Sequence, residues 1–233
     1  MKILRLSLFL FSAYAALATA HAAPLKISAT YGMIVNNQDV GLVKETFSRK
    51  GKTYQVRSET SAIGIFSFLS KGKILLVSRG DIGADGLRPR HFEHHRGDDP
   101  NKAIFANFDW SKNKLSLKYD GRSETADLPA GTQDRLSLMY QFMFMPRDAK
   151  LSFPMTNGRA LETYRYILVG EEKITTPIGT LQTLRYTKLR DKDDEDSTDI
   201  WLAKDKQFFP VRVLMRKKDG GQTEQIITDL EIH

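Results

Sequence analysis

The sequence predicts an all-β protein with one main helix, folded as a curved antiparallel sheet or half-open β-barrel. Two observations carry this prediction. Apolar and polar residues alternate in many short stretches, and turn sequences separate these stretches at intervals of roughly 8–12 residues. A sandwich and a barrel-like sheet both fit this pattern, and the short connections favour an antiparallel meander. Only residues 133–145 form a long stretch that breaks the alternation.

The strand pattern is clear in the middle of the chain and near its C-terminal end. Leu115 and Leu117 alternate with lysine and serine, and Val211, Val213 and Met215 alternate with polar residues and leucine. Successive side chains of a strand point to opposite faces, so each stretch predicts a strand with one buried face. We count roughly a dozen such strands.

Residues 133–145 predict the one main helix. Thr132 is the expected N-cap, Asp134 lies in the first turn where its charge suits the helix dipole, and Pro146 ends the pattern. Apolar side chains occupy nearly the whole circumference, so little of this helix can face water. We therefore expect it to pack on or in the concave face of the sheet.

Residues 1–22 have the features of an export signal. Lys2 and Arg5 precede an apolar run over residues 6–17, and small residues follow. We expect cleavage after Ala22, with cleavage after Ala20 as the alternative. A membrane anchor is disfavoured because the run is only ~12 residues long. Residues 23–233 are then expected to form a single β-rich domain with no stable membrane span.

Composition narrows the classes of function. The chain has no cysteine, which excludes disulfides and a lipid anchor on a cysteine at the cleavage point. Its formal net charge is +7, and loss of Lys2 and Arg5 with the signal lowers this by two, to +5. Lysine and arginine are spread over nearly every segment, so we expect no nucleic-acid partner. Binding of the basic surface to anionic headgroups or glycans is an alternative, although a merely solvated surface is favoured.

No catalytic motif is found, and we expect a protein that is not an enzyme and has no cofactor. His91, Glu93 and His95 would share one side of a strand, as metal ligands could, but an exposed polar strand end is favoured over a metal site. An acidic run over residues 191–199 lacks the spacing of a calcium loop and is interpreted as a solvated hairpin tip.

An apolar cluster over residues 63–69 is interpreted as core packing or, alternatively, as a lid that contacts a ligand. Methionine suits adaptable binding surfaces, and the predicted helix is rich in it. We therefore expect five residues to line or cover an apolar ligand-binding cavity: Phe66, Phe68, Met139, Phe142 and Met143.

Several short motifs, in order along the mature chain, resemble an exported proteobacterial family known as domain of unknown function 3108. They are Tyr31 with Gly41, Ser78-Arg79-Gly80, Gly86-Leu87-Arg88-Pro89, Phe108-Asp109-Trp110, Gln133-Asp134-Arg135-Leu136-Ser137, Thr176-Pro177-Ile178-Gly179, Trp201-Leu202-Ala203 and Phe209-Pro210-Val211-Arg212. The resemblance implies a periplasmic location and no catalytic residues. It also implies a curved sheet like that of the periplasmic lipoprotein carriers, which is an analogy of fold alone.

Two functions follow as hypotheses. The first is a periplasmic, non-enzymatic protein that holds a lipid, a lipoprotein acyl chain or another apolar ligand in the concavity of the sheet. The second is a cell-envelope scaffold or polysaccharide-associated accessory factor, in which the helix fills the barrel and an envelope protein or other partner binds outside. Asp134 and Arg135, at the start of the helix, are expected to form a structural ion pair that fixes it to the sheet, rather than a catalytic pair.

Overall fold

The computed structural model describes residues 24–69, 72–97, 99–190 and 196–233. The signal predicted at residues 1–22 and most of the acidic run, residues 191–195, lie outside these ranges. The described chain is mostly β-structure, as predicted, with fifteen strands instead of a dozen. The strands are β1 (Lys26–Val35), β2 (Gln38–Lys50), β3 (Thr53–Ala62), β4 (Ile74–Gly83), β5 (Gly86–Arg96), β6 (Ile104–Asp109), β7 (Lys114–Tyr119), β8 (Arg122–Asp127), β9 (Gln133–Asp134), β10 (Lys150–Thr156), β11 (Leu161–Thr176), β12 (Gly179–Lys188), β13 (Ser197–Ala203), β14 (Phe209–Arg216) and β15 (Gln222–Ile232).

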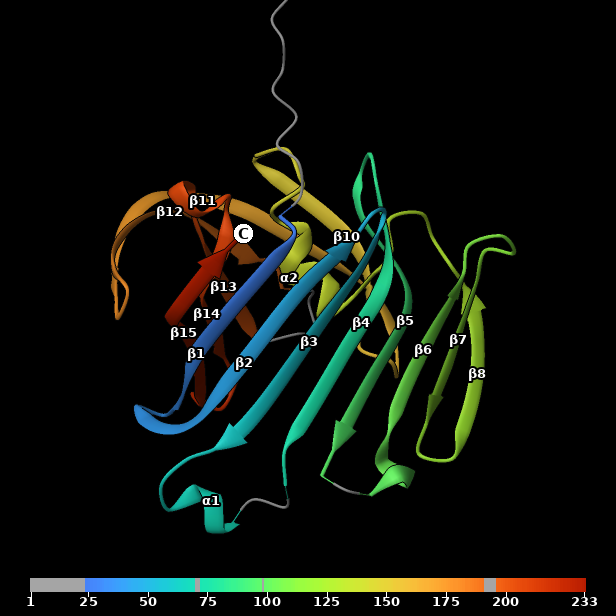
Figure 1. The fold of residues 1–233 in the computed structure, drawn as a ribbon, viewed down its shortest axis with the longest axis horizontal. Coiled ribbons are helices and arrows are strands. Elements are labelled where there is room, and N and C mark those ends of the chain that lie inside the picture. The colour runs from blue at the N-terminus through green and yellow to red at the C-terminus, as the bar shows by residue number, and fades with distance from the viewer. Residues whose placement is uncertain (1–23, 70–71, 98, 191–195) are drawn as a thin grey trace, which may run out of the picture.

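All fifteen strands belong to one sheet, in the order β8 to β1 and then β15 to β9. The pairing of β1 with β15 joins the two ends of the described chain at the middle of the sheet, with Ile27 opposite Ile232. All neighbours are antiparallel except β9, which runs parallel to β10. The sheet curves strongly without pairing its two edges, so it is a half-open barrel, as the sequence predicts (Figure 1).

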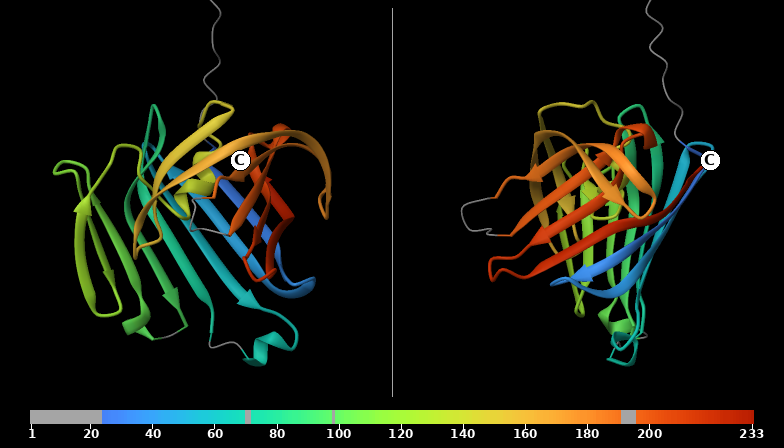
Figure 2. Two further views of the ribbon diagram at one scale, coloured as in Figure 1. Left: turned by 180° about the vertical axis from the view of Figure 1, so that it is seen from behind. Right: turned by 90° about the vertical axis from the view of Figure 1, so that its left-hand side faces the viewer.

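Two short α-helices lie at different places in this curve. Helix α1 (Phe66–Leu69) follows β3 at one end of the strands, and α2 (Ser137–Gln141) lies inside the curve (Figures 1 and 2). Two 3-10 helices, η1 (Pro100–Lys102) and η2 (Lys204–Lys206), complete the elements. The prediction that the helix packs on the concave side is confirmed.

The predicted extent of this helix is wrong. Residues 133–145 were expected to be helical throughout, but α2 covers only five residues, and Gln133 and Asp134 form β9. The Thr132 hydroxyl donates to the carbonyl of Pro129, so Thr132 does not cap α2. The apolar character of the segment reflects burial on all sides, which short irregular segments can share with a helix.

Alternation predicts the burial of β7 correctly and that of β14 incorrectly. Leu115 and Leu117 are buried, whereas Met215 is 38% exposed and Leu214, on the opposite face, is buried. A register shift in the pairing of β13 with β14 occurs at Trp201 and Leu202. Both faces of β14 are covered in part, so a two-face pattern cannot describe it.

The core has two neighbouring clusters, and α2 contributes to both. Tyr140 belongs to the larger cluster, built mainly on β1 to β7 and on β14, whereas Leu138 and Phe142 belong to the cluster over β10 to β13. The helix therefore packs between the two walls of the curved sheet. This position makes α2 and the segment before it the first place to search for a function.

Candidate functional site

Aromatic packing holds α2 inside the sheet. The Tyr140 ring stacks on Phe47 of β2 with centroids 5.5 Å apart, and meets Phe209 of β14 edge-on at 5.6 Å. Phe142 lies 5.6 Å from Tyr166 of β11, again edge-on. Such ring pairs add stability beyond the burial of their area. Leu138, Tyr140 and Phe142 are each only 1% exposed, so these three side chains fill space in the core.

Asp134 connects the start of α2 to the sheet. Its Oδ2 accepts a hydrogen bond of 2.5 Å from the Ser78 hydroxyl of β4, and its Oδ1 accepts from the backbone N–H groups of Leu136 and Ser137. Ser78 is also hydrogen-bonded to the Tyr54 hydroxyl, at 3.0 Å. The predicted role of Asp134 as a structural connection fits these contacts. The predicted partner is wrong, because Arg135 forms no ion pair with Asp134 among the described residues, and the hydrogen-bond partners of Asp134 are hydroxyl and backbone groups.

Burial raises the pKa of Asp134 to about 6, against the opposing effect of the hydrogen bonds from Ser78 and from the start of α2. Removal from water disfavours the charged form of a carboxyl group. Asp134 therefore loses its proton at mildly acidic pH, above the range of an ordinary aspartate. Its hydrogen bonds are complete within the fold, which is typical of a structural carboxyl group and not of one that transfers protons to a substrate.

Two glutamines, Gln133 and Gln141, connect α2 and the residues before it to the hairpin between β4 and β5 by hydrogen bonds. The Gln141 amide accepts from the backbone N–H of Leu87 at 2.7 Å and donates to the carbonyl of Asp85 at 2.7 Å. Gln133 donates to the carbonyl of Leu87 at 2.8 Å. Gly86 has a φ of +94°, and a Cβ there would lie 2.5 Å from Gln141 Oε1, so only glycine allows this close approach.

One acidic side chain lies on the concave face below α2. The Tyr140 hydroxyl donates to Glu45 Oε2 at 3.1 Å. Removal from water by the surrounding protein raises the pKa of Glu45, although hydrogen bonds from Ser58 and Tyr140 oppose this effect. Glu45 is half-buried and therefore keeps some contact with water. A carboxylate at this position is a poor lining for a hydrocarbon chain.

The five residues predicted to line a cavity do not come together. Phe66 and Phe68 lie on α1, at the far end of the strands from α2 (Figure 1). The Phe68 side chain is 90% exposed. Met139 and Met143 are partly buried against the core, and Phe142 is part of it. The first two could share a surface with a partner, whereas the other three lie in the packed interior. Their binding of a ligand stays a prediction.

The side chains of His91, Glu93 and His95 lie on β5. Glu93 pairs with His95 at 3.0 Å and with Arg79 at 2.9 Å, and His91 is hydrogen-bonded to Asn107. Burial would raise the pKa of Glu93, but the hydrogen bonds from His95 and Arg79 outweigh it and lower that pKa. Within the described ranges, no group of three or more histidine and acidic residues has the geometry to hold a metal ion.

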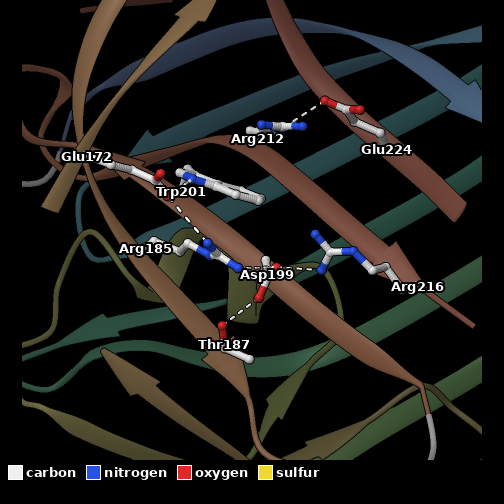
Figure 3. A network of polar contacts seen from close by, with 8 residues as sticks. All are labelled: Glu172, Arg185, Thr187, Asp199, Trp201, Arg212, Arg216 and Glu224. Atoms are coloured by element: carbon white, nitrogen blue, oxygen red, sulfur yellow. Dashed lines mark hydrogen bonds and ion pairs between the residues drawn. The ribbon is translucent and has the colours of Figure 1, made fainter. Parts of the chain in front are cut away.

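A polar network covers the face of β12 to β14 that points away from α2 (Figure 3). Asp199 is 1% exposed and accepts from Arg185 at 2.9 Å, Arg216 at 2.6 Å and Thr187 at 2.5 Å. The expectation that Asp199 belongs to a solvated hairpin tip is therefore wrong. Burial would raise the pKa of Asp199, but the bonds from Arg216 and Thr187 and the arginine charges lower it.

Trp201 is the centre of the same network. Its indole N–H donates to Glu172 at 2.6 Å, and the guanidinium groups of Arg185 and Arg212 lie 5.2 and 4.6 Å from its ring centroid. Arg212 also pairs with Glu224 at 2.7 Å. Three arginines therefore meet three carboxylates, and the network is balanced in charge (Figure 3). Such a face is suited to stabilising the sheet rather than to binding a charged ligand.

Two recesses lie elsewhere, on neighbouring parts of β2 to β6. Their volumes are about 510 and 410 Å³, and both include Asp81 and Arg90, so they adjoin one another. The residues that line the first are Asp81, Arg88, Arg90, Asn107, Phe108, Asp109, Trp110 and Ser111, and those that line the second are Ser48, Arg49, Lys50, Thr53, Tyr54, Gln55, Arg79, Gly80, Asp81 and Arg90. We call these adjoining recesses the hairpin groove. Sequence reasoning missed this site because its arginines come from separate strands.

No helix in the described part of the chain is long and apolar enough to cross a membrane.

The described chain folds as one curved, half-open sheet filled by a short helix, which is a β-barrel-like architecture. A family model described as protein of unknown function DUF3108 matches residues 26–226, and the chain belongs to that family. No curated protein matches the sequence.

Solved structures resemble the fold at low sequence identity. A β-barrel-like protein of domain of unknown function DUF1849 from Brucella abortus is 11% identical, covers 91% of this chain and 99% of its own, and has a TM-score of 0.57. A domain described as an outer membrane lipoprotein-sorting protein from Vibrio parahaemolyticus is 12% identical over 89% of this chain and 85% of its own. Its TM-score of 0.30 is too low to carry an argument, and the first likeness shows the fold alone.

Proposed function

We propose that this protein is a non-enzymatic component of the bacterial cell envelope that acts through its outer surface. The observation that carries the proposal is the burial of Leu138, Tyr140 and Phe142, each 1% exposed, between the two walls of the sheet. A carrier of acyl chains needs an apolar space at this place. The export signal predicted at residues 1–22 supports a location in the periplasm.

The anchoring of α2 supports the same proposal. Asp134 holds its start to β4, and Gln141 holds its end to the hairpin between β4 and β5. Movement of α2 out of the sheet would leave several polar groups without partners, which costs about 1–3 kcal/mol for each buried group. A lid that opens for a lipid would be held less firmly.

The second candidate is the carrier function, with a lipid or lipoprotein acyl chain as the ligand. Met139 and Met143 favour it because they are partly buried beside the core clusters, where flexible side chains could make room. Under this alternative, an apolar ligand would displace the two methionines and contact Phe142.

Native mass spectrometry of protein purified from periplasm without detergent, together with lipid extraction, separates the two. The proposal predicts the mass of the polypeptide alone, no co-purifying lipid, and no uptake of a fluorescent fatty acid. A bound lipid near one per chain, or probe uptake weakened by Phe142→Ala and not by the exposed Phe68→Ala, would establish the carrier instead.

A further inference from the structure

The hairpin groove lies at one end of the sheet, where three hairpins meet. In an antiparallel meander every second hairpin falls at the same end, so the turns after β2, β4 and β6 form one rim. Lys50, Asp81 and Trp110 come from these three hairpins in turn. The exposed side chains of Ile65 and Phe68 lie after β3 and therefore at the opposite end.

Positive charge dominates the lining of this groove. Lys50, Arg79, Arg88 and Arg90 contribute four cationic side chains, against two carboxylates, Asp81 and Asp109. A recess lined by one sign of charge concentrates the opposite sign in front of it.

Two of these cations have no carboxylate to neutralise them. Arg90 pairs with Asp81 at 2.5 Å and Arg79 with Glu93 at 2.9 Å, but Arg88 and Lys50 form no ion pair within the described residues. Arg49 lies opposite Tyr54, on the face of β2 that carries the buried Phe47, so its side chain points away from that of Lys50.

An aromatic ring and neutral polar groups complete the lining. Trp110 is partly buried, its indole N–H donates to the carbonyl of Pro89 at 2.6 Å, and Arg88 lies 4.8 Å from its ring centroid. Asn107 and Gln55 add amide groups that can both donate and accept hydrogen bonds. Amides and an aromatic edge beside cations suit a ligand with hydroxyl groups as well as negative charge.

We propose that the hairpin groove binds an acidic polysaccharide, with Arg88 and Lys50 contacting its carboxylate groups. The inference rests on the proposed action through the outer surface and names the chemical class of its ligand. The two recesses adjoin and are open along the rim, which suits an extended chain more than a compact anion. A lipid surface is disfavoured, because the described lining has no exposed aliphatic side chain to insert and the exposed Ile65 and Phe68 lie at the other end.

The test uses hexagalacturonate as the acidic probe, maltohexaose as its neutral counterpart, and vesicles of phosphatidylglycerol and phosphatidylcholine. Calorimetric titration should give binding to hexagalacturonate that weakens with added salt, as expected for exposed charges, and none to maltohexaose. The chain has two tryptophans, and Trp201 lies in the balanced network. A fluorescence change on binding should therefore disappear in Trp110→Phe while calorimetry still detects the ligand.

Charge-matched double variants locate the site. Arg88→Gln with Lys50→Gln should weaken binding about tenfold or more, the effect of losing one good charged hydrogen bond. Lys118→Gln with Lys150→Gln removes the same charge from exposed positions outside the groove, and should change affinity by no more than about twofold. Far-ultraviolet circular dichroism confirms that both variants fold.

Three results would overturn the inference: no binding to hexagalacturonate, equal loss in both double variants, or binding to anionic vesicles without binding to the soluble probe. Each is distinguishable from failure of the proposed function, which appears as bound lipid in native mass spectrometry.

Discussion

Arginines behave differently on the two halves of this sheet. On the face of β12 to β14, Arg185 and Arg216 share the buried carboxylate of Asp199, and Arg212 pairs with Glu224. At the hairpin groove, Arg88 has an aromatic neighbour and no carboxylate among the described residues. All three arginines of the network are therefore paired with carboxylates, whereas the groove also contains Arg88, whose charge is available to a ligand.

This difference distinguishes residues that stabilise the fold from residues that can bind a ligand, in a protein without a catalytic motif. A balanced, buried network is strongly disturbed by removal of one member but has little charge left for a ligand. An unbalanced, exposed group contributes little to folding and can interact with an external anion. Substitutions in the two halves should therefore affect different measurements.

The largest expected effect is a loss of stability on substitution in the core, between the two halves of the sheet. Phe142→Ala removes a ring that contacts Phe153, Tyr166 and Tyr186. We expect urea unfolding to show a loss of about 3–5 kcal/mol, because the cavity cannot collapse fully. Affinity for hexagalacturonate should stay unchanged. A loss below about 1 kcal/mol would show that Phe142 borders a space instead of filling one.

The next effect compares one carboxylate from each half. Asp199→Ala leaves Arg185 and Arg216 without a buried partner, and we expect a loss of about 2–3 kcal/mol, reduced from the value for fully buried pairs because the arginines are partly exposed. Asp81→Ala should cost less than about 1 kcal/mol, since Arg90 is 67% exposed. Equal losses in urea unfolding would remove the distinction between the halves.

A third effect depends on pH and concerns Asp134. Its folded pKa is raised to about 6 from an ordinary value of 3.8, so the native protein holds this proton more tightly than the unfolded chain. The stability it contributes is present at low pH and is lost as pH rises from about 4 to about 6. Asp134→Asn cannot ionise, and its amide can donate to Ser78, which can donate to Tyr54.

We therefore expect the stability of Asp134→Asn, relative to the wild type, to rise by about 2–3 kcal/mol between pH 4 and pH 7. Comparison with the wild type at each pH is required because His94 acts in the opposite direction. Burial and nearby arginine charges lower the pKa of His94 to about 4, so its contribution increases with pH. A difference between the two proteins that is constant with pH would show that Asp134 has an ordinary pKa.

The smallest expected effect is a change in the affinity of the hairpin groove for hexagalacturonate. Asp81→Asn removes a negative charge from the lining and frees Arg90 from its ion pair. We expect affinity for hexagalacturonate to rise by about two- to fivefold, the size of a surface charge interaction. Asp205→Asn, on η2 and outside the groove, is the control and should leave it unchanged. Weaker binding in Asp81→Asn would mean that Asp81 contacts the sugar directly.

Strand alternation was sufficient to predict the fold class, because most strands of this sheet have one covered face. It failed on β14, where Leu214 and Val211 are buried on opposite faces after a register shift. It also overestimated the helix, since residues buried on every side look alike whether they form α2, β9 or the turn that follows. A local sequence pattern does not show which faces of a strand or helix are covered by segments that are distant in the sequence.

Site residues were harder to predict for the same reason. The motif around Asp134 was correctly singled out, but its partner Ser78 lies 56 residues away in the sequence. Asp199 was grouped with exposed acids because its neighbours in sequence are acidic, whereas its arginine partners come from β12 and β14. The hairpin groove had no sequence signal beyond basic residues near three turns.

Amide hydrogen exchange with and without hexagalacturonate tests the central claim most directly, because it maps binding on both halves at once. The account predicts added protection around Arg49 and Lys50, from Arg79 to Arg90, and around Trp110, with no change over β12 to β14 or in α2. Protection over the balanced network of Asp199 and Trp201, or within the concave side around Tyr140 and Phe142, would contradict it.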